Sequence, residues 1–134
     1  MQVEDPLFPD ILSRLFAVTG ATPVEHRETL LCCGKACRDI NMSLDMTQAV
    51  FQSVRESGAD CLGLICPACF DSFDIGQIRV SKKFNMDYQI PLVYYFQVLA
   101  MAKGAQPEEV GLHYHKIMPK SFLQKFSIQT TEVS

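Results

Sequence analysis

Residues 60–69 read Asp-Cys-Leu-Gly-Leu-Ile-Cys-Pro-Ala-Cys, and this stretch decides the fold. Its first six residues form a short, nearly continuous apolar run, which is typical of a central parallel strand covered by helices on both faces. The run ends at Cys66, and Pro67 suits the first position of a helix that carries Phe70 and continues toward Phe84. The stretch therefore predicts a strand followed directly by a helix, with two cysteines at the junction.

The segments on either side of this stretch alternate in the same way. Asp5 and Ser43 are expected to cap the first two helices. The expected helices span residues 6–20, 43–58, 67–84 and 96–103, and a last short one opens at Pro107. Further short strands are expected near 23–26, 29–31 and 90–94.

This alternation predicts a single α/β domain. We expect a mainly parallel sheet of about four short strands, with flanking helices and right-handed crossovers. The cysteine site should lie at the carboxyl ends of the strands, where open parallel sheets bind their ligands. The stretch after Met118 has little periodicity and is expected to be a loosely held tail.

Composition narrows the class of protein. The chain has 134 residues, a net charge of −3, 48% apolar and 20% charged residues, which excludes a disordered acidic tail. Its mild acidity gives no electrostatic reason to expect nucleic acid as a partner. Its apolar runs are too short or too interrupted to span a bilayer, and its first residues do not resemble a signal peptide. We therefore expect a cytoplasmic protein whose six cysteines serve as metal ligands or redox groups.

Four of the six cysteines form two tight pairs, Cys32/Cys33 and Cys66/Cys69, each at the end of an expected strand. Both pairs can therefore meet at one edge of the sheet. The positive end of the helix dipole favours the thiolate form of the second pair, and the thiolate binds metals and attacks disulfides. Gly34 allows the sharp turn that a compact site needs after the first pair.

Three kinds of site remain open on these residues. Adjacent cysteines favour a polynuclear iron–sulfur cluster, since neighbouring side chains splay apart and suit one zinc ion poorly. A zinc-stabilised interaction domain is the second possibility. The third is a thioredoxin-like dithiol protein using Cys66 and Cys69, although it leaves Cys32 and Cys33 unexplained.

Other candidate residues have simpler interpretations. Cys61 lies inside the expected strand and should be a small buried hydrophobic residue. Cys37 is expected to be incidental, although it could replace a ligand. His113 and His115 could be ligands or proton donors, but His115 is expected to be a satisfied surface histidine. The aromatic residues 94–96 are expected in the core.

The sequence resembles the cysteine-rich "CCG" domain found in the B subunit of heterodisulfide reductase, which is shared with iron–sulfur subunits of glycolate and lactate oxidases. The resemblance covers about residues 5–115 and is closest to the C-terminal copy of that domain. The motifs that carry it are Cys-Cys-Gly at 32–34, Gly-Ala-Asp at 58–60, Cys-Pro-Ala-Cys at 66–69, and residues 90–97 and 111–115.

The resemblance implies a noncubane 4Fe–4S cluster at which electron transfer or disulfide cleavage occurs. It implies iron ligation by Cys32, Cys33, Cys66 and Cys69, with Gly34 and Pro67 shaping the site; no catalytic residue follows from it. The implied partners are iron–sulfur and flavin subunits of an oxidoreductase complex and a thiol or disulfide substrate.

Two departures from the family pattern matter: the gap from Cys-Cys to Cys-x-x-Cys is a little shorter than is usual for the family, and the first cysteine of the pattern is missing. The pattern begins with a cysteine at the end of a strand upstream of the first helix, and this sequence contains neither. The expected CCG domain, residues 1–118, therefore lacks one strand and one ligand, and residues 119–134 form the tail. We expect the chain to be a subunit or fragment that is inactive alone, and a whole cluster could exceed what it can hold.

Overall fold

The computed structural model describes residues 4–127 of the chain. Two short strands pair in parallel, with Leu62 opposite Leu92 and Leu64 opposite Tyr94. The elements follow one another as α1 (Ile11–Val18), α2 (Ile40–Ser57), β1 (Leu62–Leu64), α3 (Pro67–Phe84), β2 (Leu92–Tyr94), α4 (Tyr95–Ala102), the 3-10 helix η1 (Leu112–Tyr114) and α5 (Lys120–Ser127).

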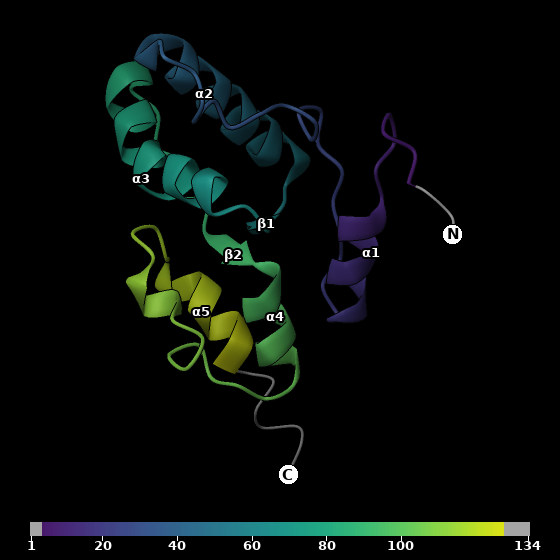
Figure 1. Cartoon of the computed structure of the whole chain (residues 1–134). Helices are drawn as coiled ribbons and strands as arrows, with labels where there is room; N and C mark the ends of the chain where they lie inside the picture. Colours follow the sequence, from purple (N-terminus) through teal and green to yellow (C-terminus); the bar gives the residue numbers. More distant parts are fainter. Residues whose placement is uncertain (1–3, 128–134) are drawn as a thin grey trace.

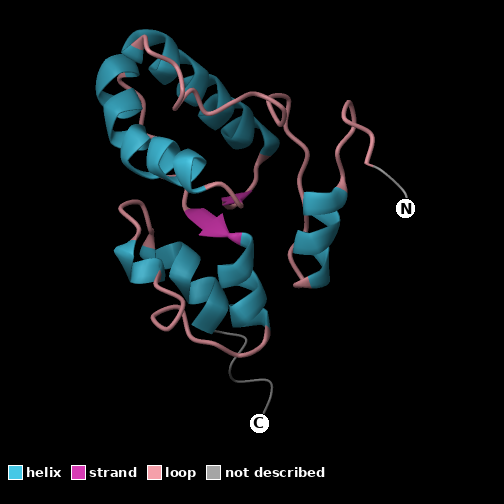
Figure 2. Cartoon of the chain, in the orientation of Figure 1, coloured by secondary structure: helices cyan, strands magenta, loops and turns pink. Residues whose placement is uncertain are grey.

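The strands lie between two groups of helices. Helices α2 and α3 pack side by side on one side of the strand pair, and α4 and α5 lie on the other (Figure 1). Figure 2 shows how small the sheet is compared with the helices that cover it. Within residues 4–127, no helix is long and apolar enough to cross a membrane. The parallel strand pair with helices on both sides confirms the expected α/β domain with flanking helices.

The expected number of strands is wrong, because the described chain has two strands rather than four. Residues 23–26 have no regular structure, and residues 27–30 form turns. The backbone there is satisfied locally: Thr29 donates to the carbonyl of His26, and Glu28 donates to the hydroxyl of Ser53. These hydrogen bonds use backbone groups that would otherwise pair with a neighbouring strand.

The first helix begins later than expected. Its first residue is Ile11 rather than Pro6, and Asp5 instead accepts a hydrogen bond from the backbone of Leu7 in a turn. The reason is Pro9, which disfavours the helical conformation at Phe8 and lacks the backbone donor that a helix interior requires.

The second and third helices lie where they are expected, with one change of cap. Asp39, not Ser43, caps α2 and accepts hydrogen bonds from Asn41 and Met42. Gly58 ends α2 with a φ of 74°, in the left-handed conformation that glycine adopts readily. Pro67 is the first residue of α3, as the sequence predicts.

The stretch after Met118 is more ordered than its weak periodicity indicates. Lys120–Ser127 forms α5, and its Phe122 is buried in a small core with Val93 and Leu112. The rest of the expected tail, residues 128–134, lies outside the described residues. The segment after Pro107 also differs from expectation, because it forms turns and then η1 instead of an α-helix.

Side chains satisfy the edge of β2 that faces away from β1. Gln77 of α3 uses both ends of its carboxamide, donating to the carbonyl of Ile90 at 2.6 Å and accepting from its N–H at 2.9 Å. The carbonyl of Leu92 contacts Nδ1 of His115 at 2.9 Å, and the N–H of Tyr94 donates to Oε1 of Gln97 at 2.9 Å. Polar groups that would otherwise be buried without partners are paired in this way.

Candidate functional site

The N-terminus of α3 holds the second cysteine pair directly after β1. Cys66 is the N-cap residue, with extended backbone angles, and its side chain is exposed. Pro67 fixes the first helical position, so that Cys69 lies within the first turn and is half-buried. The two thiols therefore lie at the positive end of the helix dipole, as the sequence predicts.

These two thiols have opposite acidities. Hydrogen bonds from the backbone N–H of Cys69, from the Cys69 thiol and from the N–H of Ala68 lower the pKa of Cys66. Burial, together with hydrogen bonds to Cys33 and Cys66, raises the pKa of Cys69 to about 12. Cys66 is therefore the thiol that ionises first, and Cys69 acts as its hydrogen-bond donor.

The Cys-Cys-Gly turn brings Cys33 to the same place. Cys33 is buried, and its carbonyl accepts a hydrogen bond from the hydroxyl of Thr47 in α2. Gly34 has a φ of 80°, and a Cβ at this position would lie 3.0 Å from the Cα of Ser43. The turn therefore requires glycine for its backbone angle and also for its close approach to α2.

An ion pair joins the two cysteine segments at the surface. Lys35, directly after the Cys-Cys-Gly turn, pairs with Asp71, two residues after Cys69. The Lys35 ammonium lowers the pKa of the Asp71 carboxyl. Both side chains are about half exposed, so the pair adds little to the stability of the fold.

The structure brings together three of the four cysteines that the sequence singles out. Cys69 hydrogen-bonds to Cys33 and to Cys66, whereas Cys32 is exposed and its sulfur accepts from the N–H of Gly34 at 3.5 Å. Thiols are the donors that iron–sulfur clusters and zinc take, so the donor set fits such a group in kind. Among residues 4–127, no three Cys, His, Asp or Glu side chains have the spacing of a formed metal site.

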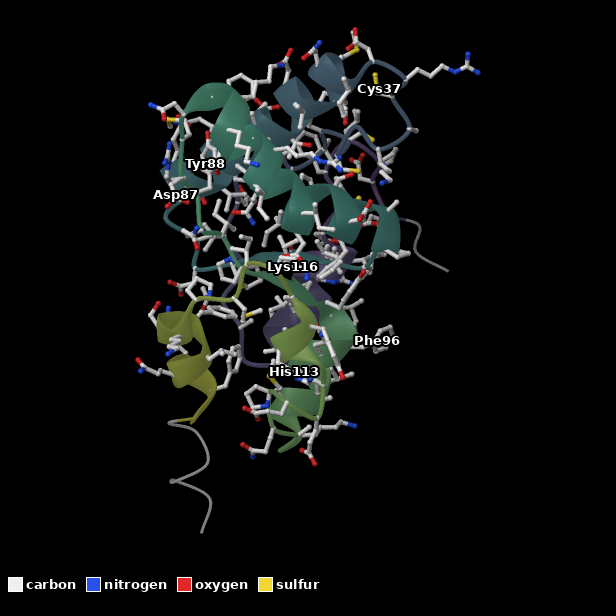
Figure 3. All side chains as sticks on the ribbon, turned by 90° about the vertical axis from the view of Figure 1, so that its left-hand side faces the viewer. Cys37, Asp87, Tyr88, Phe96, His113 and Lys116 are labelled. Carbon is white, nitrogen blue, oxygen red and sulfur yellow. The ribbon has the colours of Figure 1, made fainter. Side chains whose placement is uncertain are left out.

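The two remaining cysteines lie outside this cluster. Cys61 packs against the small core around Val93, and burial raises the pKa of its thiol to about 11. Cys61 was expected to be a small buried residue inside the strand, but it is only half-buried and directly precedes β1. Cys37 lies in the loop before α2, as Figure 3 shows, and its N–H donates to the carbonyl of Gly34.

An aromatic wall, formed by the rings of Phe70, Tyr94 and His115, lies beside the cysteines and was not predicted from the sequence. The ring of Phe70, next to Cys69, stacks on Tyr94 with centroids 5.0 Å apart and meets the His115 ring edge-on at 4.7 Å. Burial raises the pKa of the Tyr94 hydroxyl, and the charges of the Cys66 and Cys69 thiolates raise it further. In the sequence, Tyr94 is marked only by its position at the end of an expected strand. An aromatic residue of the core would occupy the same kind of position, so this signal does not indicate a site.

His115 is held in one tautomer by its neighbours. Its Nδ1 faces the carbonyl of Leu92 and so carries the proton, while Nε2 lies 3.1 Å from the amide nitrogen of Gln97 and accepts from it. Burial lowers the pKa of His115. The histidine is thus satisfied, as expected, but it is half-buried and supports the aromatic wall rather than lying on the surface.

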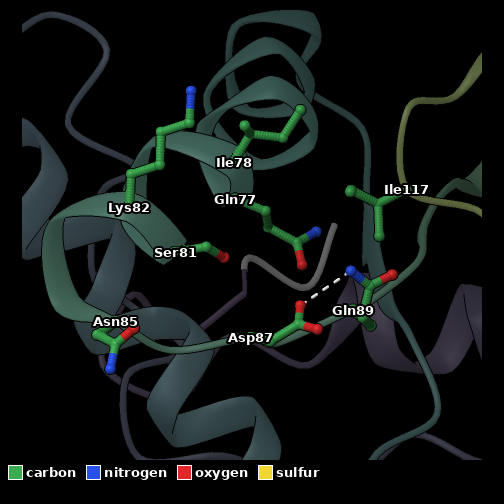
Figure 4. Close-up of a pocket in the computed structure, with 8 residues that line it drawn as sticks. All are labelled: Gln77, Ile78, Ser81, Lys82, Asn85, Asp87, Gln89 and Ile117. Atoms are coloured by element: carbon green, nitrogen blue, oxygen red, sulfur yellow. Dashed lines mark hydrogen bonds between the residues drawn. The ribbon is translucent and has the colours of Figure 1, made fainter.

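One pocket in the described part of the chain lies away from the cysteines. It has a volume of about 470 Å³ and lies toward the C-terminal end of α3, where Asp87 and Gln89 hydrogen-bond to each other (Figure 4). Its lining is Gln77, Ile78, Ser81, Lys82, Asn85, Asp87, Gln89 and Ile117. The thiol cluster lies instead at the opposite end of that helix.

Comparison with known proteins finds matches over the part of the chain that carries both cysteine pairs. The family model of the CCG cysteine-rich domain matches residues 1–74, which include both cysteine pairs. The B subunit of the ferredoxin/F(420)H(2)-dependent CoB-CoM heterodisulfide reductase of Methanosarcina acetivorans is 35% identical over 92% of this chain and 42% of that protein. The B subunit of the ferredoxin:CoB-CoM heterodisulfide reductase of Methanosarcina mazei is 34% identical over 91% of this chain and 41% of that protein.

A more distant relative belongs to a different reductase. The membrane anchor subunit of the 8-methylmenaquinol:fumarate reductase of Wolinella succinogenes is 25% identical over 81% of this chain and 39% of that protein. The chain thus spans about two fifths of the length of the curated relatives it matches.

Proposed function

The chain belongs to the CCG cysteine-rich domain family, and we propose that it is part of a heterodisulfide reductase-like iron–sulfur oxidoreductase. In this proposal, Cys32, Cys33, Cys66 and Cys69 ligate a 4Fe–4S cluster that transfers electrons for the reduction of a disulfide. The observation that carries it is that Cys33, from the Cys-Cys-Gly turn, and Cys69, from the first turn of α3, pack in one core although they are distant in sequence.

The residues of the chain have distinct roles in this proposal. The cluster, when bound, would supply one-electron chemistry at a sulfur-rich centre. Cys66, with its lowered pKa, presents a thiolate at lower pH than Cys69 does. Gly34 brings the first cysteine pair close to α2, and Pro67 places the second pair at the positive end of α3.

The rest of the reaction requires other polypeptides. Cleaving a disulfide to two thiols takes two electrons and two protons, and the electrons would arrive from iron–sulfur and flavin subunits. The relatives are named as subunits of reductases, which supports this arrangement. We further propose that the assembly is cytoplasmic and that this chain is inactive alone.

Anaerobic purification tests the proposal. We expect a broad brown absorbance, with several irons and matching sulfide per chain, that is lost in Cys66→Ser and Cys69→Ser. Cys61→Ser is the matched control and should keep its iron, because Cys61 packs in a separate core. A colourless protein with one tightly held zinc contradicts the cluster, and full iron in Cys66→Ser contradicts the ligand assignment.

One observation favours a second candidate, a dithiol redox protein. Cys66 has a lowered pKa and contacts Cys69, whose pKa is raised, as in a pair of attacking and resolving thiols. A chain that holds neither iron nor zinc after anaerobic purification, and that forms a reversible Cys66–Cys69 disulfide with a dithiol/disulfide buffer, would favour this candidate.

A further inference from the structure

The pocket at the C-terminal end of α3 has no part in the proposed function. Its volume of about 470 Å³ is within the range of sites that hold small molecules. Two apolar side chains, Ile78 and Ile117, line it together with polar side chains of α3 and of residues 85–89 (Figure 4). Ile117 is buried, whereas Ile78 is 43% exposed, so the pocket presents an apolar surface beside its polar groups. This lining suits a ligand that has an apolar body and polar ends.

Two side chains of opposite charge also line this pocket. Lys82 belongs to the last turn of α3, and Asp87 follows that helix in the loop before β2. The neighbouring Lys83 pairs with Asp45, whereas neither Lys82 nor Asp87 has an ion-pair partner among residues 4–127. The charges of Lys82 and Asp87 are therefore available to a ligand.

Gln89 orients the Asp87 carboxylate within the pocket. Its Nε2 donates to Oδ1 of Asp87 at 2.9 Å (Figure 4), and the second oxygen can accept from a ligand. The φ of Gln89 is 49°, in the left-handed region that side chains other than Gly, Asn and Asp seldom adopt. The next residue, Ile90, is held at its N–H and its carbonyl by buried Gln77. Strained backbone that its surroundings hold in place is concentrated at ligand-binding sites.

We propose that this pocket binds a small zwitterion of the class of free apolar amino acids. The ammonium group of the ligand pairs with Asp87, and its carboxylate pairs with Lys82. Its apolar side chain packs against Ile78 and Ile117. The negative end of the α3 dipole favours the ammonium group as well. An amine or an acid alone would use only one of the two charged side chains. The pocket and the cysteines lie at opposite ends of α3, so this inference does not rest on the proposed function.

Titration of the complete chain with L-leucine tests the proposal, with backbone amide chemical shifts as the readout. It is done at low salt, because Lys82 and Asp87 are exposed. We expect saturable shifts at the pocket residues. The comparison probes are 3-methylbutylamine and 4-methylpentanoate, which keep the apolar body of leucine and carry one charge each. Each should bind about tenfold more weakly than leucine, because each loses one charge-assisted contact.

Two variants assign the charges. Asp87→Asn should bind leucine no better than 4-methylpentanoate, and Lys82→Gln should bind leucine no better than 3-methylbutylamine. Glu108→Gln and Lys103→Gln are the matched controls, since both positions are exposed and neither lines the pocket; they should bind leucine as the parent does.

Gln89→Gly tests the role of the strained residue. Glycine relieves the backbone strain at a φ of 49° and removes the side chain that orients Asp87. Leucine binding should weaken, although the variant unfolds at no lower urea concentration than the parent. The proposal is overturned if leucine gives no saturable shifts at the pocket or binds no more tightly than the singly charged probes. Parent-like leucine binding in both Asp87→Asn and Lys82→Gln overturns it as well.

Discussion

The ring of Phe16 fills the space above Gly63, where a Cβ at residue 63 would lie 2.5 Å from the ring carbon Cζ. Phe16 belongs to α1 and Gly63 to β1, so this contact seats the first helix on the sheet. The same ring also meets Tyr95 edge-on at 5.5 Å, which ties α1 to α4.

Gly63→Ala should therefore destabilise the protein. The added methyl group overlaps a ring that also packs against Tyr95, and we expect a loss of about 1–3 kcal/mol in the free energy of unfolding, measured with urea. Gly76→Ala is the matched control, since its nearest neighbour is Thr47 at 3.7 Å and alanine favours helices. In the double variant, Phe16→Ala should offset part of the stability that Gly63→Ala loses. If the losses in unfolding free energy of the two single variants simply add, the result argues against this contact.

Gly34→Ala should disrupt the cysteine site as well as the fold. Alanine meets strain at a φ of 80° and a steric clash with Ser43, so the Cys-Cys-Gly turn must shift. We expect a loss of about 1–3 kcal/mol in stability and a lower iron content per folded chain. Iron content equal to that of the parent would show that the turn does not position the ligands.

Gln77→Ala should cost more than an ordinary surface change. It leaves the N–H and the carbonyl of Ile90 without their partners, and we expect a loss of about 2–5 kcal/mol in unfolding free energy. Gln106→Ala, at an exposed position, should change stability little. Equal effects in the two variants would contradict the role given to Gln77.

The metal-free chain should lose stability as the pH falls. Burial lowers the pKa values of His26 and His115 in the folded state, so the unfolded chain binds more protons below pH 7. The stability present above about pH 6.5 should decline as the pH falls through that value toward the folded pKa values. Urea unfolding from pH 8 to pH 5 measures this slope. His115→Gln should flatten it, whereas His113→Gln, at an exposed position, should leave it as steep.

In the reduced, metal-free chain, Cys66 should react with iodoacetamide before Cys61 and Cys69. It is exposed and has a lowered pKa, whereas the pKa of Cys61 is about 11 and that of Cys69 about 12. Since each pKa unit changes the thiolate fraction tenfold, Cys66 should react at least roughly ten times faster than Cys61 at pH 7. Peptide mapping over time gives the order, and earlier modification of Cys61 would contradict it.

The sequence predicted the parts of the fold that local signals specify. The run at residues 60–65, Pro67 and Gly58 each mark a strand, a helix start or a helix end, and all three are confirmed. The strands expected near 23–26 and 29–31 do not form, because the hydroxyl of Ser53, distant in sequence, accepts a hydrogen bond from the N–H of Glu28. No sequence pattern within residues 23–31 predicts such a partner.

The arrangement of the candidate site could not be predicted from the sequence. The spacing of the cysteines indicated a shared site, yet it could not separate exposed Cys32 from buried Cys33. That difference depends on how the turn meets α2. The place of Tyr94 depends on the strand register, which emerges only when β1 and β2 pair.

The pairing of Ile90, Leu92 and Tyr94 with side chains on the outer edge of β2 also bears on self-association. Unpaired strand edges template the growth of intermolecular sheets, and proteins avoid aggregation by covering them. Because α3, Gln97 and His115 occupy this edge, another strand can join β2 only after these contacts break. In the described part of the chain β1 pairs with β2 alone, so β1 has the strand edge from which a sheet could be extended.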